Sequence, residues 1–171
     1  KRYFATKDNT ITNAFKSNLL TRATGSNMGA SDILEAFVIH GQTSASVNAR
    51  NAEQSRILVQ FPVDDMLSDI SDGTVPSSSV EYRLKMFNAP HADSTPLGYN
   101  LEVALVNKDW NEGTGLDMDA YKDLGASNWV NASASSTWTW AGGDYLTAAA
   151  YSANFYFSGG LEDIDLDVNY A

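Results

Sequence analysis

The chain has 171 residues, of which 43% are hydrophobic, 11% aromatic and 19% charged, and it contains no cysteine. This length predicts a single domain with a sizeable core, and the lack of cysteine excludes disulfides, thiol catalysis and cysteine-ligated metal sites. No apolar run approaches the roughly 18–20 residues of a membrane span, so we expect no membrane partner.

The formal net charge of −10 is unevenly distributed along the chain. Residues 1–100 carry nine basic and ten acidic side chains, whereas residues 101–171 carry two basic and eleven acidic ones. Because such an acidic segment repels phosphate backbones, we expect no nucleic-acid partner. The abundance of serine, threonine and asparagine favours turns and exposed strand faces over helices.

Apolar and β-branched residues at short intervals predict a series of strands. The clearest one covers residues 56–63, where Ile57, Val59, Phe61 and Val63 alternate with other side chains and are expected to share one face. In chain order, strands are expected over residues 3–13, 32–40, 56–63, 80–87, 100–110, 151–157 and 161–168.

One short helix and one long loop interrupt this pattern. Met66, Leu67 and Ile70 fall at helical spacing after Asp64, which predicts a helix over residues 64–71 that ends at Gly73. Residues 111–136 predict a loop longer than the roughly 12–15 residues that are common in compact domains. We therefore expect one all-β domain over residues 1–171, a β-sandwich that is truncated at its C-terminal end.

The segment around the long loop is rich in aromatic residues. Trp110, Trp129 and Trp140 are candidate platforms for a sugar ring, which would make a surface glycan a partner. The alternative is that Trp110 and Trp129 pin the loop to the core.

The acidic residues suggest two kinds of site. Asp117, Asp119 and Asp123 could supply the oxygen ligands that calcium prefers. The alternative is that these residues make turn and cap hydrogen bonds. Apart from calcium, we expect no cofactor. The alternating acids at 163, 165 and 167 predict an exposed strand face that discourages edge-to-edge pairing. Glycosidases act through a pair of carboxyl groups, so a polysaccharide-degrading enzyme that uses two of these acids is an alternative. No nucleophile elbow and no glycine-rich phosphate loop occurs in the sequence, so we expect no enzyme.

Several segments, in order over about residues 50–168, resemble DNRLRE-type modules. Residues 56–61 (RILVQF) and 81–86 (EYRLKM) are similar to the first two strands of that family, and residues 161–168 (LEDIDLDV) to its l-D-V-T strand. Its shorter motifs W-x-E-G and N-W are similar to residues 110–113 (WNEG) and 128–129 (NW). Before residue 50, the turn at residues 27–32 (NMGASD) is similar to its N-x-G-x-s-x-x-L motif.

The resemblance implies a jelly-roll-like β-sandwich of the carbohydrate-binding-module type without catalytic residues. With the loop sequence WNEGTGLDMD at residues 110–119, the chain looks most like structural proteins of marine contractile-tailed bacteriophages. We therefore expect a virion protein of the tail, neck, fibre or capsid surface whose loops contact other virion proteins or further copies of itself. The alternative is a carbohydrate-binding or adhesion module of a secreted bacterial protein, which would be extracellular or at the cell surface.

Overall fold

The computed structural model describes residues 1–39, 53–90, 96–122, 125–157 and 163–169. It is 33% strand and 6% helix, which confirms the predicted all-β class, while the jelly-roll arrangement stays a prediction. The elements in chain order are β1 (Lys7–Thr12), β2 (Val38–Ile39), β3 (Glu53–Gln60), α1 (Val63–Ser71), β4 (Arg83–Met86), β5 (Tyr99–Ala104), β6 (Asn131–Ser133), β7 (Ser136–Thr137), β8 (Ser152–Phe157) and β9 (Ile164–Asp167).

The chain divides into two compact units, each made of two segments. Unit 1 combines Lys1–Val63 with Lys108–Asp144, and unit 2 combines Asp64–Asn107 with Tyr145–Ala171. The expectation of one domain over residues 1–171 stays a prediction.

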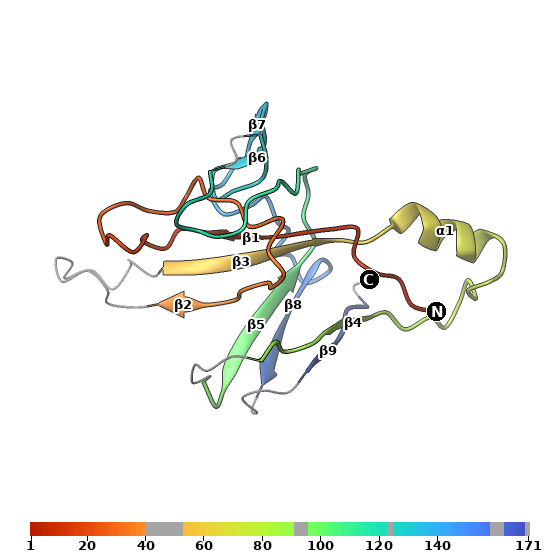
Figure 1. Cartoon of the computed structure of the whole chain (residues 1–171). Coiled ribbons are helices and arrows are strands. Elements are labelled where there is room, and N and C mark those ends of the chain that lie inside the picture. The colour runs from red at the N-terminus through yellow and green to blue at the C-terminus, as the bar shows by residue number, and fades with distance from the viewer. Residues whose placement is uncertain (40–52, 91–95, 123–124, 158–162, 170–171) are drawn as a thin grey trace. The chain divides into compact units, whose positions relative to one another are not determined.

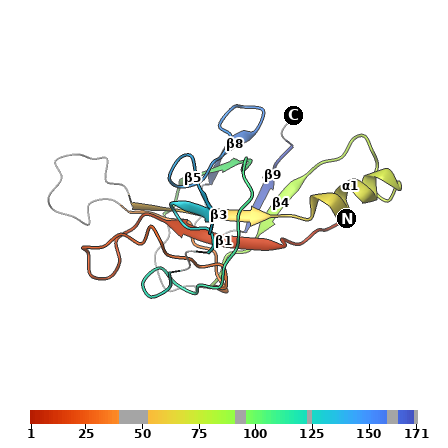
Figure 2. The same ribbon diagram turned by 90° about the horizontal axis from the view of Figure 1, so that it is seen from above.

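Unit 1 is built on β1 and β3, which lie side by side in both views (Figures 1 and 2). They pair antiparallel from Lys7 opposite Gln60 to Thr12 opposite Ser55, and β2 pairs with the other edge of β3. Strands β6 and β7 form a separate antiparallel pair. The apolar core of this unit consists of Ile11, Leu58, Trp110, Trp129, Ala132 and Trp138.

The predicted strand at residues 56–63 is confirmed as β3, although β3 covers Glu53–Gln60 and so ends before Phe61. Leu58 is the buried apolar side chain of the strand, while Ile57 and Val59 on the opposite face are half-buried. Leu58 belongs to the same apolar cluster as the buried tryptophans, which come from residues 110–138. Val63 does not end the strand; it is the first residue of α1.

The predicted helix is confirmed as α1, and it begins one residue earlier than expected. Asp64 and Asp65 lie in its first turn, where a negative charge interacts favourably with the helix dipole. It ends before Gly73, whose φ of 81° is the left-handed conformation common after helix ends. None of its residues is buried. Among the described residues, no helix is long and apolar enough to cross a membrane.

Unit 2 contains two antiparallel strand pairs, β4 with β9 and β5 with β8 (Figure 1). Leu166 of β9 is its buried apolar side chain among the residues described, with 3% exposed. The rings of Tyr99 and Phe157 stack across β5 and β8 with their centroids 5.1 Å apart. These strands confirm the predictions for residues 80–87, 100–110 and 151–157 over shorter ranges, and β9 does so for the described part of residues 161–168.

Two predicted elements differ from the structure. Of the strand expected over residues 32–40, β2 covers Val38–Ile39, and residue 40 lies outside the described residues. Before β2, the backbone amides of Glu35 and Phe37 donate hydrogen bonds to the hydroxyls of Thr10 and Ser55. These two amides are therefore bonded to side chains and not to the backbone of a neighbouring strand. The described residues of the long loop expected over 111–136 are irregular before β6 and β7, which form a hairpin at its end.

Candidate functional site

Three buried asparagines and one serine hold the loops of unit 1 together. We call this group the asparagine junction; it comprises Asn9, Asn27, Ser127 and Asn128, and all four are fully buried. Most buried polar groups form hydrogen bonds that offset the loss of water, so the partners of these side chains show which segments they fix.

Asn27 uses both ends of its side-chain amide. Its Nδ2 donates to the carbonyl oxygens of Glu112 at 2.6 Å and Ser127 at 2.9 Å. Its Oδ1 accepts from the backbone amides of Gly29 at 3.1 Å and Gly115 at 2.8 Å. These four bonds saturate the amide and bring three distant segments to one point.

Asn9 and Asn128 extend the junction to a strand and a turn. Asn9, on β1, donates from Nδ2 to both the carbonyl oxygen and the hydroxyl of Ser127, and its Oδ1 accepts from the amide of Met28. Asn128 Oδ1 accepts from the amides of Val130 and Asn131, which caps the turn into β6. The strand, the loop and the hairpin are thus joined by short polar contacts.

Glycines allow the segments at the junction to approach this closely. A Cβ at Gly115 would lie 1.9 Å from the carbonyl oxygen of Asn27, and one at Gly29 would lie 2.2 Å from that of Glu112. Gly113 has a φ of 88°, and a Cβ there would lie 2.5 Å from that of Ala126. No larger residue fits at these positions without moving backbone.

Two of the three candidate tryptophans are core residues. Trp110 and Trp129 are buried in the apolar cluster of unit 1, so neither offers a ring face to a sugar. This corrects their assignment as platforms and agrees with the alternative that they anchor the loop. Trp140 differs from them because 76% of its surface is exposed.

The turn that carries Trp140 is held by one carboxylate. Asp144 accepts hydrogen bonds from the amide and hydroxyl of Thr139 and from the amide of Trp140, each 3.0 Å long. Lys108 Nζ lies 3.5 Å from the same carboxylate. Burial alone would raise the pKa of Asp144, but these hydrogen bonds and the Lys108 charge lower it on balance. The indole is therefore presented from a rigid turn.

The two expected calcium ligands that the structure describes, Asp117 and Asp119, accept hydrogen bonds from backbone amides. Asp117 Oδ1 accepts from the amides of Asp119 and Ala120 at 2.8 and 2.7 Å. Asp119 Oδ1 accepts from the amide of Ser17 at 3.0 Å, and its bonds to Ser17 lower the pKa of its carboxyl. Asp123 lies outside the described residues, within which no group of three histidine or acidic side chains is placed to hold a metal. Calcium binding by these residues stays a prediction.

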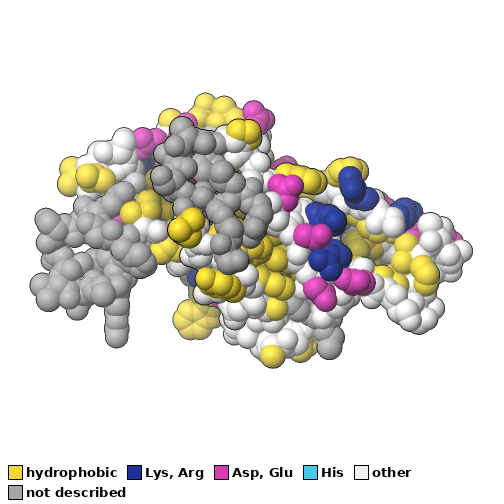
Figure 3. Space-filling view, turned by 90° about the horizontal axis from the view of Figure 1, so that it is seen from below, with side chains coloured by type: hydrophobic (Ala, Val, Ile, Leu, Met, Phe, Trp, Pro, Cys, Tyr) yellow, Lys and Arg dark blue, Asp and Glu magenta, His cyan; other side chains and the backbone are white. Residues whose placement is uncertain are grey.

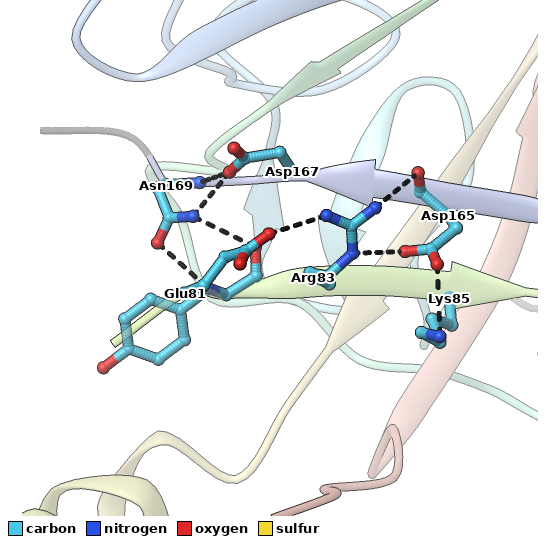
Figure 4. Close-up of polar contacts among 7 residues, drawn as sticks. Glu81, Arg83, Lys85, Asp165, Asp167 and Asn169 are labelled. Atoms are coloured by element: carbon cyan, nitrogen blue, oxygen red, sulfur yellow. Dashed lines mark hydrogen bonds and ion pairs between the residues drawn. The ribbon is translucent and has the colours of Figure 1, made fainter. Parts of the chain in front are cut away.

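The acidic row of β9 lies on an exposed face, as predicted, but basic residues of β4 compensate it (Figure 4). Arg83 Nε and Lys85 Nζ lie 2.7 and 3.1 Å from the carboxylate oxygens of Asp165, and these hydrogen bonds lower the pKa of its carboxyl. Asp163 accepts from the backbone amide of Asn88. Because exposed ion pairs stabilise little, the cluster contributes little to the stability of the β4–β9 pair.

Residues 15–22 form a rigid loop with two exposed leucines, which the sequence did not single out. We call it the leucine loop. It is closed by a bridge between Phe15 and Arg22, and 85% of Leu20 is exposed. Asn18 Oδ1 accepts from the amides of Leu20 and Thr21 at 2.9 Å each.

Leu19 in the same loop is also exposed, and its φ of 53° is the left-handed conformation that side-chain-bearing residues rarely adopt. Such strain persists where the surrounding structure enforces it, and it is concentrated at functional sites. The consecutive leucines at 19 and 20, between Lys16 and Arg22, are the sequence signal that marks this loop.

Comparison with protein-family models, with curated proteins and with solved structures gives no match for this chain.

Proposed function

We propose that this chain is a non-catalytic structural protein of a bacteriophage virion, located in the tail, neck, fibre or capsid surface. The motifs that resemble DNRLRE-type modules support this proposal, because segments 27–29, 110–113 and 128–129 all contribute to the asparagine junction or to the core beside it. A scaffold pinned in this way can present loops and a helix without distorting its core.

The observation that carries the proposal is the number of large apolar side chains at the surface of both units. Apolar side chains in yellow reach the surface of the face shown in Figure 3. Contiguous apolar patches are small on monomeric soluble proteins, and larger ones commonly mark interfaces. The side chains with the largest exposed fractions are Leu20, Leu97, Trp140, Phe4, Phe87 and Tyr156.

The test is to locate the protein in purified phage particles. Antibodies raised against the folded protein, coupled to gold, should label one defined part of intact particles in electron micrographs. Mass spectrometry of density-gradient fractions should detect the protein in the particle band at a fixed ratio to the major capsid protein. Antibodies from non-immunised animals serve as the labelling control. A protein found in the lysate but not in the particle band would contradict the proposal.

Trp140 favours a second candidate, a carbohydrate-binding module. An indole held out by Asp144 from a rigid turn loses little conformational entropy when it stacks on a sugar ring. A glycan array should then show binding that Trp140→Ala abolishes. Tyr156→Ala removes an equally exposed aromatic ring from unit 2 and is the matched control. Loss of binding in both variants, or in neither, would argue against a site at Trp140.

A further inference from the structure

We propose that two copies of this chain associate through the outer edge of β4, which pairs antiparallel with β4 of the second copy around a twofold axis at Arg83. This inference deepens the proposed structural function, because it names a second copy as the partner, and it rests on that function. It follows from an open strand edge and from the order of the charged residues along that strand.

Strand β4 forms backbone hydrogen bonds along one edge only. The pairing with β9 continues beyond β4 to Tyr82, whose carbonyl oxygen accepts from the amide of Val168 at 3.0 Å. Because successive residues of a strand point their backbone groups to opposite edges, Glu81, Arg83 and Lys85 direct theirs away from β9. Among the described residues, no strand pairs with this outer edge. Such an edge is a template for a further strand.

The side chains that alternate along this edge are complementary to themselves. Glu81 lies two positions before Arg83, and Lys85 lies two positions after it. When two copies pair antiparallel with Arg83 opposite Arg83, Glu81 of each copy lies opposite Lys85 of the other. The same register sets the outward backbone groups of both copies opposite each other, so that the strands can exchange hydrogen bonds. Opposite charges directly across a strand pair stabilise it.

The charged side chains of this edge are available for the contact. The side chains of Glu81 and Lys85 are 60% and 54% exposed. The charge of Arg83, which meets its own copy at the axis, is compensated within each chain (Figure 4). Its Nε lies 2.7 Å from the carboxylate of Asp165, and its Nη1 lies 2.6 Å from that of Glu81. The two guanidinium groups therefore approach as parts of compensated clusters.

The opposite face of the same stretch is apolar and is incompletely covered. Tyr82 is 37% exposed, and Val80, Leu84 and Met86 are half-buried. In the proposed register, Tyr82 of one copy lies opposite Leu84 of the other, and Val80 lies opposite Met86. The apolar face thus continues from one copy to the next, and cross-strand pairs between aromatic or aliphatic side chains add to the stability of the contact.

The outer edge of β9 is less suited to pairing. Two copies of β9 would bring the acidic side chains at positions 163, 165 and 167 against each other, and like charges across a strand pair destabilise it. The carbonyl oxygen of Asp165, which points to that edge, already accepts from Arg83 Nη2 at 3.5 Å. A contact between β4 and β9 of different copies would be heterologous, whereas twofold contacts are the commonest kind between identical chains.

The contact is small and should therefore be weak. A strand edge of five residues per copy buries less than the roughly 1,200 Å² of a standard stable interface. Each copy also carries a net charge of −10, which opposes association. In about 0.15 M salt, charges further apart than about 8 Å are largely screened, while pairs directly across two strands are closer than this. Measurements belong at this ionic strength.

Sedimentation velocity of the purified chain over a range of concentrations is the first test. We expect a monomer–dimer equilibrium without larger species, because a twofold contact closes on itself. Lys85→Glu and Glu81→Lys should each weaken the dimer by about tenfold or more, because each replaces two attractive pairs by two repulsive ones. Glu102→Lys and Lys122→Glu make the same changes of charge at exposed positions away from β4 and should dimerise like the unchanged chain.

The double variant Glu81→Lys, Lys85→Glu identifies the partner surface. It should regain the dimer, because opposite charges again lie across the contact with their order reversed. It keeps the loss of the ion pair between Lys85 and Asp165 that the single variant suffers, so its recovery cannot come from repair within one chain. In a contact between β4 and β9, the acidic side chain at position 85 would still face Asp165, and the double variant would stay weak.

Cross-linking locates the twofold axis. The chain contains no cysteine, so a single introduced thiol can link only to a second copy. Residues 83 of the two copies would have Cα atoms about 5.5 Å apart, within the range of about 4.4–6.8 Å for a disulfide, and Arg83→Cys should form a disulfide-linked dimer on mild oxidation. Lys85→Cys should not, because its two copies would lie about 13 Å apart. If circular dichroism shows that Arg83→Cys melts early, an equimolar mixture of Glu81→Cys and Lys85→Cys should give the linked dimer.

Three results would overturn the inference: a chain that stays monomeric up to about 1 mM, a double variant that does not regain association, or Lys85→Cys that links as readily as Arg83→Cys. These measurements use the purified chain alone. A monomeric protein that is found in particles would refute this inference and leave the proposed function standing. A dimer that is absent from particles would refute the proposed function.

Discussion

Asn27 and Ser127 lie 100 positions apart in the sequence, yet Asn27 Nδ2 donates a hydrogen bond of 2.9 Å to the carbonyl oxygen of Ser127. The same side chain binds the backbone of Gly29, Glu112 and Gly115. One buried amide therefore connects the first turn of unit 1 to both ends of the long loop. The stability of this unit should depend on polar contacts at this point as well as on its tryptophan core.

Replacement of Asn27 tests this dependence. Asn27→Ala leaves two buried amides and two carbonyl oxygens without their partner, and each unsatisfied group costs about 1–3 kcal/mol. We expect the free energy of unfolding, measured by urea denaturation, to fall by about 3 kcal/mol or more. Asn154→Ala, on the exposed side of β8, should change it by less than about 0.5 kcal/mol. Equal effects of the two variants would contradict a central role for Asn27.

Two glycines of unit 1 provide a contrasting pair. Gly115→Ala places a Cβ 1.9 Å from a backbone oxygen, so the long loop must move and the thermal midpoint should fall by more than about 10 °C. At Gly25 nothing lies within 4 Å of a Cβ, so Gly25→Ala should be neutral or slightly stabilising. Differential scanning calorimetry of both variants measures the contrast. A Gly115→Ala protein that melts like the unchanged chain would show that the loop is not held at this position.

Trp138 and Trp140 are two positions apart, but truncation should destabilise the fold much more at Trp138 than at Trp140. Trp138 is buried, and its Nε1 donates to the carbonyl oxygen of Asn128 at 2.8 Å. Trp138→Ala should therefore cost about 3–5 kcal/mol of unfolding free energy. Trp140→Ala removes a mostly exposed ring and should cost less than about 0.5 kcal/mol. Chemical denaturation followed by far-ultraviolet circular dichroism gives both values, and a large loss for Trp140→Ala would place that ring in a packed interior.

Asp8 should make stability depend on pH. Burial, and then the nearby negative charge of Glu112, raise the pKa of Asp8. The folded state therefore binds this proton more tightly than the unfolded state, so the charged form lowers stability at neutral pH and the penalty disappears as pH falls through the folded pKa. Asp8→Asn should raise the urea midpoint at about pH 7 and not at about pH 3.

The control for this measurement is Asp32→Asn, which removes the same charge from an exposed position. Its effect on the urea midpoint should be small at both pH values. If Asp8→Asn lowered the midpoint at neutral pH, the carboxylate would be stabilising in the folded state and the expected sign would be wrong.

Local patterns predicted most of the regular elements, because the signals for them lie within a few residues, but they did not indicate β6 and β7. Helix α1 follows from the spacing of Met66, Leu67 and Ile70 before a glycine, and β3 from the alternation around Ile57. The buried face of β3 could not be predicted in the same way. It is set by tryptophans more than fifty positions further along the chain, and alternation does not say on which face they lie.

The asparagine junction was missed for a similar reason. Asparagine is typical of turns and exposed loops, so composition alone suggested surface positions for Asn9 and Asn27. The groups that accept hydrogen bonds from their Nδ2 atoms lie between 85 and 118 residues away, in the loop after Trp110. The signal that could have indicated a crowded site was the pair Gly113 and Gly115, because closely spaced glycines often mark backbone that must approach another segment.

The separation between the asparagines and their partners also affects how the chain is made. Ribosomes add roughly 5–20 residues per second, so about 5–20 seconds pass between the synthesis of Asn27 and that of Ser127. During that interval the loop that β1 and the following turn bind has not yet been synthesised. Their apolar residues therefore remain exposed and can aggregate. Folding of unit 1 on the ribosome must therefore wait for the second half of the chain, and overproduced protein should benefit from a chaperone that protects the nascent N-terminal segment.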